Sequence, residues 1–450
     1  MNIDNLLRCS SGFDAAVDSA STRGQDMMDL MARLWPICRA PTGAGIRETY
    51  DILSETIPLK RHRMASGTKV FDWTVPKEWN IRDAYIKDPQ GKRIVDFREN
   101  NLHVVHYSTP ISAKMSLSEL KLHLHSLPGL PEAIPYMCSA YEETWGFCLT
   151  HQQLQNLVDG EYEVVIDSSL EDGYLDYCDL RIGPEDAPEI LISTYCDHPS
   201  MANNELSGPI ITLFLYEYLA GIEDLRFAYR FLFLPETIGA IVYLHQHGSI
   251  LRERVHAGFE VTCCGDDGPY NYKRSRQHNS ASDQAATHVL SHGLMPDKKV
   301  IIHDYFPQGG ANERQYNSPG FNLPIGSLTR SMYGSYPEYH TSLDNMDFVS
   351  SEGMSSSLVA YLRIFQTLEC DRKLLNTKPY GEPQLGKRGL YVPMGIHDTF
   401  EENIRDLLFL LCYCDGNFSL FEIAEKIQVP IWRLMSAVKR LAEKELLTAI

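Results

Sequence analysis

Several familiar catalytic and metal-binding patterns are absent from the 450-residue sequence. It contains no HExxH, no GxSxG and no GxxxxGKS/T, which argues against thermolysin-like proteases, serine hydrolases and P-loop enzymes. None of its 11 cysteines is spaced as CxxC and their number is odd, so neither a zinc ribbon nor a paired disulfide framework is indicated. The chemistry must therefore come from other residue types, and a reducing compartment fits the cysteines best.

A long apolar run is also missing. The longest apolar stretches, which start at Pro209 and Arg230, are shorter than the roughly 18 to 20 residues that cross a bilayer. The first residues, MNIDNLLRCSSGF, carry acidic and polar groups where a secretory signal has a basic start and an apolar centre. We expect a soluble, cytoplasmic protein without a membrane partner.

Positive charge is scarce, with 41 Lys and Arg against 59 Asp and Glu and a formal net charge of -18. Such a surface repels phosphate backbones at long range, which disfavours nucleic acid as the main partner. The hydrophobic content of 44% and the charged content of 22% are typical of globular proteins. A chain of 450 residues exceeds one hydrophobic core and predicts two or three domains.

The pattern of apolar and polar residues changes twice along the chain. Residues 24–60 have the apolar spacing of two amphipathic helices. From Lys69 to about Gly183, short β-like runs alternate with Pro, Gly and Asp turns. From Pro188, strands alternate with helices, which predicts an α/β domain with a mostly parallel sheet. We therefore predict a discontinuous α/β domain (1–68 and 184–378) that carries a β-rich insert (69–183).

The tail, 379–450, is predicted to fold as a winged helix. Residues 399–413 have a helical pattern, and Ser419 with Glu422 forms the sequence signature of a capping box. Two further helices complete a helix-turn-helix pattern. Its basic side chains are diluted by acids, so we favour a packing or dimerisation module without specific nucleic-acid binding, and leave homo-oligomerisation open. The basic residues are Arg433, Lys439, Arg440 and Lys444, and the acids are Glu425, Glu443 and Glu445.

Three segments place His or Glu directly after β-like runs. His198 and Glu205 lie in STYCDHPSMANNELSG, Glu236 in FLFLPETIGA, and His340 in YPEYHTSLDN. The carboxyl ends of parallel strands meet at one edge of a sheet, so these residues can converge despite their separation in sequence. Imidazole and carboxylate are the ligands that suit Zn²⁺, and a catalytic site needs about three of them with an open position.

These segments, together with GGANERQYNSPG, resemble a group of bacterial aminopeptidase-like proteins related to the zinc aminopeptidase and glutaminyl cyclase clan. The resemblance covers most of the chain and implies a sheet with helices on both faces, a β-rich insert and a winged-helix tail. It implies that His198 and His340 bind a metal and that Glu236 is the general base.

Four positions depart from the clan's pattern. The bridging Asp is replaced by Asn204, the second of two paired glutamates by Thr237, and two further acids by Thr262 and Asn312. Each replacement removes a negative charge that would offset a second cation. We therefore expect one zinc ion at most, with Glu205 as a substitute ligand.

The expected reaction is metal-assisted hydrolysis of an amide or peptide bond in a small substrate. Asp266 and Glu313 are candidates to bind a substrate ammonium, and Arg314 a carboxylate. Two alternatives stay open: a single-metal acyl-transfer enzyme of the cyclase type, and a non-catalytic binding or scaffold protein on a degenerate peptidase fold.

Overall fold

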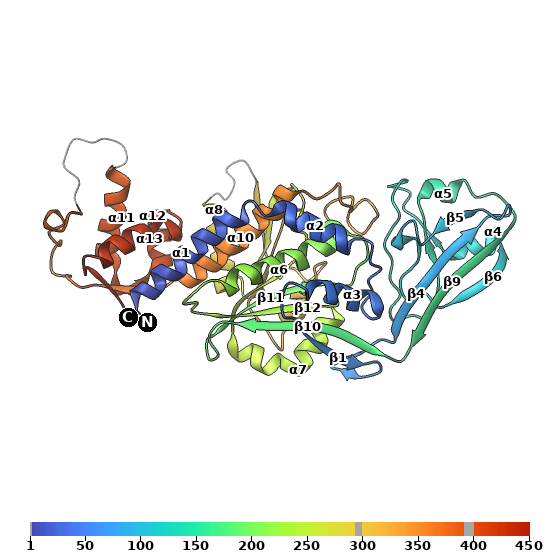
Figure 1. Ribbon diagram of the computed structural model, residues 1–450, viewed down its shortest axis with the longest axis horizontal. Helices are drawn as coiled ribbons and strands as arrows, with labels where there is room; N and C mark the ends of the chain where they lie inside the picture. The colour runs from blue at the N-terminus through green and yellow to red at the C-terminus, as the bar shows by residue number, and fades with distance from the viewer. Residues whose placement is uncertain (1, 293–298, 391–399) are drawn as a thin grey trace.

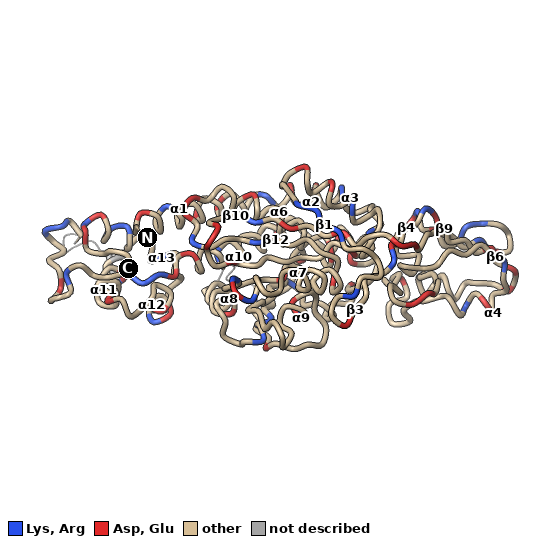
Figure 2. The backbone as a smooth tube through the Cα atoms, turned by 90° about the horizontal axis from the view of Figure 1, so that it is seen from below, with Lys and Arg blue, Asp and Glu red and all other residues tan. Residues whose placement is uncertain are grey.

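The computed structural model describes residues 2–292, 299–390 and 400–450, and it shows three parts in a row (Figure 1). A central α/β part lies between the winged helix at one end and the inserted β-rich part at the other. Both chain termini lie at the winged-helix end (Figure 1). Lys and Arg are interspersed with Asp and Glu along all three parts (Figure 2).

The central part is built on an eight-stranded sheet in the order β1-β10-β12-β11-β13-β16-β14-β15. Parallel pairing joins β12, β11, β13 and β16, and also β14 and β15; the remaining pairs are antiparallel. The predicted mostly parallel sheet is thus confirmed. The strands are β1 (Lys60–Ala65), β10 (Tyr174–Ile182), β11 (Glu189–Tyr195), β12 (Ala228–Leu234), β13 (Val255–Val261), β14 (Tyr270–Lys273), β15 (Val300–His303) and β16 (Ile325–Thr329).

Helices cover both faces of this sheet, as expected. One face carries the largest apolar cluster, which α1, α2, α3, α6, α8 and α10 share with the sheet; α7 packs on the other face (Figure 1). The helices of residues 24–60 are confirmed, whereas α1 has no counterpart among the predicted elements. The helices are α1 (Ile3–Ala20), α2 (Gly24–Leu34), α3 (Ala44–Leu53), α6 (Ser207–Ala220), α7 (Ile238–Arg254), α8 (Ala281–Ser291), α9 (Glu313–Tyr316) and α10 (Ser351–Cys370).

The inserted part has its own sheet, in the order β5-β4-β9-β6, and its own apolar core. Its strands and short helices are β4 (Glu78–Lys87), β5 (Arg93–Asp96), β6 (Ile111–Ser116), α4 (Leu117–Leu120), β7 (Leu124–His125), β8 (Phe147–Cys148), α5 (His151–Gln155) and β9 (Glu161–Glu171). The predicted bounds 69–183 are too wide at both ends. The hairpin of β2 (Lys69–Val70) and β3 (Trp73–Thr74) packs against α7, and β10 pairs with β1 and β12 in the main sheet.

The tail folds as α11 (Phe400–Tyr413), α12 (Leu420–Ile427) and α13 (Ile431–Ala442), with a small sheet of β17 (Lys373–Asn376), β18 (Asp415–Ser419) and β19 (Leu447–Ala449). The capping box of Ser419 and Glu422 is present. The predicted start at residue 379 is too late, because β17 is the middle strand of the tail's sheet and follows α10 directly. Within the described residues, no helix combines the length and apolarity that a membrane span requires.

Candidate functional site

The candidate site lies where the parallel strands β11 and β12 end side by side. Their register pairs Tyr195 with Leu234, so the loops that follow them start at the same edge of the sheet. Those loops carry His198 and Glu236, and Nε2 of His198 lies 3.4 Å from Oε2 of Glu236. The expected convergence of these two residues is therefore observed.

Glu205 lies against the other side of the same imidazole. It belongs to a π-helical turn (Ala202–Leu206) that leads into α6, a type of turn that is frequent at functional sites. Its Oε2 is 3.0 Å from Nδ1 of His198, and both side chains are buried. The two nitrogens of His198 thus face two different carboxylates.

Asp197 adds a third buried carboxylate that the sequence reading did not single out. Its Oδ1 accepts the backbone N–H of Glu236 at 2.6 Å, which ties the loop after β11 to the loop after β12. It also lies 3.9 Å from Nδ1 of His198. Asp197 therefore fixes the position of the proposed base as well as enlarging the acidic cluster.

His340 approaches this cluster from a loop far along the chain. Its ring centroid is 5.4 Å from that of His198, and the ring of Tyr339 stacks on it at 4.0 Å. Burial, together with the neighbouring His198, lowers the pKa of His340 to about 3. A neutral imidazole keeps a free lone pair, which is the form that binds a metal.

One cation, Arg39, is buried beneath the acids. Its Nε donates to the backbone carbonyl of His198 at 2.9 Å and lies 3.8 Å from Oε1 of Glu205, and both side chains are 0% exposed. Two buried atoms have no hydrogen-bond partner among the described residues: Nη2 of Arg39 and Oε1 of Glu205. Arg39 therefore places a fixed positive charge beside Glu205 in the buried part of the site.

The carboxylates control the protonation of the cluster. Burial raises the pKa of Asp197 to about 7 and also raises the pKa of Glu236. Burial opposes a charged imidazole at His198, but Asp197 and Glu205 outweigh it and raise the pKa of His198 to about 9. These raised pKa values mean that the cluster binds protons tightly, and a metal cation can bind in place of those protons.

The donor set fits one metal ion. Asp197, His198 and Glu205 each offer a ligand atom, and these atoms lie within 4.8 Å of one another. They are the nitrogen and oxygen donors that zinc takes, and Oε1 of Glu205 accepts no hydrogen bond within the described residues. His340 is outside this three-donor group, so the predicted trio of His198, Glu205 and His340 is brought together only in part.

Residues 28–371 match the family described as a "Domain of unknown function (DUF4910)". The chain belongs to that family. Residues 372–449 match the family of winged helix-turn-helix domains, which confirms the predicted tail.

A relative of this DUF4910 chain in Clostridium acetobutylicum is named "Putative polysaccharide biosynthesis protein with aminopeptidase-like domain". It is 44% identical over 434 residues, which cover 96% of this chain and 98% of the relative. A crystal structure of a "putative peptidase" from the same organism has a TM-score of 0.91 and 42% identity, covering 98% of this chain and 100% of the other.

Two more distant structures share the fold. A zinc aminopeptidase from Bacillus subtilis has a TM-score of 0.56 at 10% identity, covering 77% of this chain and 94% of its own. A peptidase M28 precursor from Shewanella amazonensis has a TM-score of 0.56 at 12% identity, with 80% and 96% covered. The resemblance to zinc aminopeptidases is therefore confirmed at the level of fold.

All three predicted substrate residues have partners within the protein. Glu313 pairs with Nζ of Lys273 at 3.0 Å, and both side chains are buried. Asp266 accepts hydrogen bonds from Asn203, Gly268 and Ser331. Both acids are thus bonded inside the protein, and their binding of a substrate ammonium stays a prediction. Arg314 donates longer bonds, to the carbonyl of Ala311 and to Oγ1 of Thr237, both at 3.4 Å. Its positive charge also lowers the pKa of Glu236, against the larger effect of burial, which raises it.

A second group of donors, His288, His292 and Glu425, lies between α8 and α12. Its hydrogen bonds argue against a metal there. Nε2 of His288 accepts a hydrogen bond from the backbone N–H of Ile431 at 3.0 Å. The ring proton is therefore on Nδ1, which donates a hydrogen bond to Glu425. A protonated nitrogen cannot bind a metal. This histidine instead links the DUF4910 domain to the winged helix.

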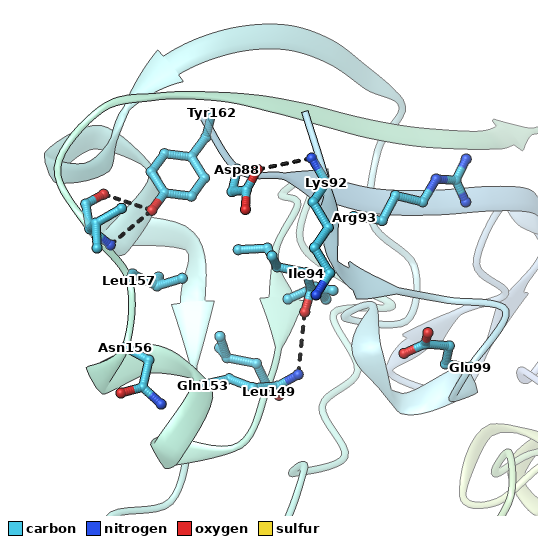
Figure 3. A pocket seen from close by; sticks show the side chains of 12 residues that line it. Asp88, Lys92, Arg93, Ile94, Glu99, Leu149, Gln153, Asn156, Leu157 and Tyr162 are labelled. Carbon is cyan, nitrogen blue, oxygen red and sulfur yellow. Dashed lines mark hydrogen bonds between the residues drawn. The ribbon is translucent and has the colours of Figure 1, made fainter. Parts of the chain in front are cut away.

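The inserted part also contains a cavity of about 370 Å³ (Figure 3). Its lining combines apolar residues, such as Ile94, Leu149 and Leu157, with charged and polar ones. The hydrogen bonds drawn there are internal, such as the one from Gln153 to the carbonyl of Ile94 at 3.3 Å (Figure 3). None of the candidate site residues lines this cavity.

Asp197 and Arg39 are the functional candidates that sequence reasoning missed. Asp197 directly precedes His198, so its position after a strand was an available signal. Arg39 is remote in sequence, and only the packing of the segment after α2 against the site brings it there.

Proposed function

We propose that this chain is a metal-dependent hydrolase of an amide or peptide bond, of the aminopeptidase type, which uses one zinc ion. The observation that carries the proposal is the buried group of Asp197, His198 and Glu205 beside Glu236, at the carboxyl ends of β11 and β12. The fold shared with a zinc aminopeptidase supports it.

His198, Glu205 and His340 would hold the ion, with Asp197 as a further donor. When bound, zinc polarises a carbonyl and lowers the pKa of a water molecule. Three carboxylates and one buried guanidinium give the cluster a net charge near -2 when the imidazoles are neutral. That charge balances one divalent ion and leaves little to stabilise a second.

Glu236 is the proposed general base. Its raised pKa brings its affinity for protons closer to that needed near neutral pH. Glu236 takes a proton from the attacking water and returns it to the departing amine. The hydrogen bond from its backbone N–H to Asp197 holds its loop in place. We propose that Arg314 pairs with a carboxylate of the substrate.

The substrate is proposed to be a small amide or peptide. The Clostridium relative is named for polysaccharide biosynthesis, so N-acylated sugars belong beside aminoacyl amides in any substrate panel. We propose no specific nucleic-acid partner, since α13 buries most of its apolar residues and packs against α1 and α10. Nanomolar, sequence-selective duplex binding would contradict this.

Metal analysis tests the proposed function directly. Protein purified without added metal should contain close to one zinc per chain and hydrolyse at least one aminoacyl amide, peptide or N-acyl sugar. Chelation should abolish hydrolysis, and zinc should restore it. A cyclised or transferred product in place of a hydrolysed one would favour the acyl-transfer alternative. Absence of bound metal would favour a scaffold protein.

A further inference from the structure

We infer that the inserted part completes the candidate site, and that Tyr136 is a positioning residue for His340. This inference rests on the proposed function in one respect only, that His340 binds the metal. The insert has its own sheet and its own apolar core. One segment, residues 134–139, nevertheless leaves that core and reaches the site.

The segment is hydrogen-bonded to the loop that carries His340. The backbone N–H of Tyr136 donates to the carbonyl of His340 at 2.8 Å, and Pro135 forms an antiparallel bridge with Thr341. Ile134 and Ser342 exchange two bonds: the N–H of Ser342 donates to the carbonyl of Ile134 at 2.9 Å, and the N–H of Ile134 donates to Oγ of Ser342 at 3.0 Å. These contacts flank His340.

His340 needs such support because its backbone is in the left-handed region, with φ of +56°. Only a few per cent of residues other than Gly adopt this conformation, although His does so more often than most, and it persists where the surroundings fix it. The bond from Tyr136 acts on the carbonyl of the strained residue itself. The insert therefore supplies part of what fixes the strained turn.

The ring of Tyr136 contacts both histidines. It meets His198 edge-on with centroids 4.9 Å apart and His340 with centroids 5.4 Å apart, at interplanar angles of 61° and 89°. Edge-to-face contacts of this kind fix relative ring orientation. A single side chain thus restrains the spacing of the two proposed ligands.

The segment is also anchored on the insert's side. The N–H of His106 donates to the carbonyl of Met137 at 2.9 Å, and the N–H of Ser139 donates to the carbonyl of His106 at 2.9 Å. The ring of His106 contacts those of Tyr136 and Trp79. Trp79 belongs to the insert's apolar core, so an unbroken series of ring contacts joins that core to His340.

Substitution of Tyr136 tests the inference. In Tyr136→Ala, we expect the zinc dissociation constant, measured by competition with a chelator, to rise at least tenfold. The d–d absorption of the cobalt-substituted protein should shift, because the ligand geometry changes. Tyr136→Phe should restore both properties, since it keeps the ring that contacts both histidines, while the backbone N–H is common to all these variants. Tyr141→Ala is the matched control, because Tyr141 is in the same loop region, 55% exposed, and packs on Trp73.

Wild-type zinc affinity and an unchanged cobalt spectrum in Tyr136→Ala would overturn the inference. If that variant does not fold, Tyr136→Leu gives the same comparison with more of the buried volume kept. If the wild-type protein binds no metal, the proposed function fails while this inference is still decided by hydrogen exchange. Residues 338–343 should then exchange faster in Tyr136→Ala than in wild type, and an unchanged rate would overturn it.

Discussion

The two parts added to the α/β domain differ in where they attach, and this difference separates their roles. The insert attaches at the edge of the sheet where strands β11 and β12 end, and its residues 134–136 contact His340. The winged helix continues from α10 and packs against the helical layer, with α13 against α1 and α10. Ligands bind beyond the carboxyl ends of parallel strands, so a part attached there can contribute residues to the site. We expect a part attached to the helical layer to affect only stability.

The winged-helix contacts are those of a domain interface. Leu6 of α1 and Cys370 of α10 lie in the same apolar cluster as the tail's own core. The guanidinium of Arg363 lies 5.0 Å from the ring of Trp432 on α13. A helix that reads DNA must present one face to the major groove. Here α13 uses its apolar residues for the tail's core and for docking against α1 and α10, and the lack of specific nucleic-acid binding stays a prediction about its polar face.

The largest effect should come from the site itself, with neither added part touched. Glu236→Gln removes the proposed base and keeps the shape of the side chain. We expect kcat to fall by about 10² to 10⁴, the usual contribution of a general base, with the bound zinc retained. Steady-state kinetics and metal analysis check this. Glu253→Gln is the matched control, because Glu253 is exposed in the last turn of α7, the helix that Glu236 precedes.

Loss of metal in Glu236→Gln would show that Glu236 is a ligand and not the base. His198→Ala and His340→Ala should both weaken metal binding, since each removes one imidazole from the proposed ligands. Wild-type metal affinity in both would rule out the proposed ligand pair.

The next effect concerns the buried charge beneath the site. Arg39→Met leaves Glu205 without its cation, and removing one partner of a buried ion pair typically costs about 3 to 5 kcal/mol of unfolding free energy. Denaturant unfolding measures this change. Arg33→Met is the control: Arg33 pairs with Glu55 on the surface, and loss of such a pair costs at most about 1 kcal/mol. Equal effects of the two substitutions would contradict the role of Arg39.

The sequence predicted what depends on local patterns. Alternating strands and helices predicted the parallel sheet, and Ser419 with Glu422 predicted the capping box that the structure shows. The loops after strands predicted that His198 and Glu236 meet, because parallel strands end at one edge. These inferences need only residue type, spacing and the rules of sheet connection.

The sequence could not predict contacts that depend on tertiary packing. Residues 174–182 have the β-like pattern of the insert, and only their pairing with β1 and β12 assigns them to the main sheet. Nothing in the local sequence of Arg39 or Tyr136 distinguishes them from ordinary core residues. Their roles arise because distant segments pack against the loops of His198 and His340.

The smallest effect should come from the link between the domain and the winged helix. His288→Ala removes the acceptor for the N–H of Ile431, in the first turn of α13, and the partner of Glu425. A buried N–H left without a partner typically costs about 1 to 3 kcal/mol. We therefore expect a lower free energy of unfolding, measured with denaturant. Zinc affinity and kcat/KM should stay at wild-type values, since the hydrogen-bond partners of the His288 side chain are Ile431 and Glu425 and neither belongs to the candidate site.

His292→Ala is the matched control, because its ring lies 4.6 Å from that of His288 at the end of the same helix. The His292 side chain is half-buried and takes no part in the hydrogen bond to Ile431. Its substitution should therefore lower the free energy of unfolding by only about 0.5 kcal/mol. Together with Tyr136→Ala, these variants separate the two added parts: substitution in the insert should change metal binding, and substitution at the winged-helix contact should change stability alone. A fall in zinc affinity in His288→Ala would show that the winged helix, too, acts on the site.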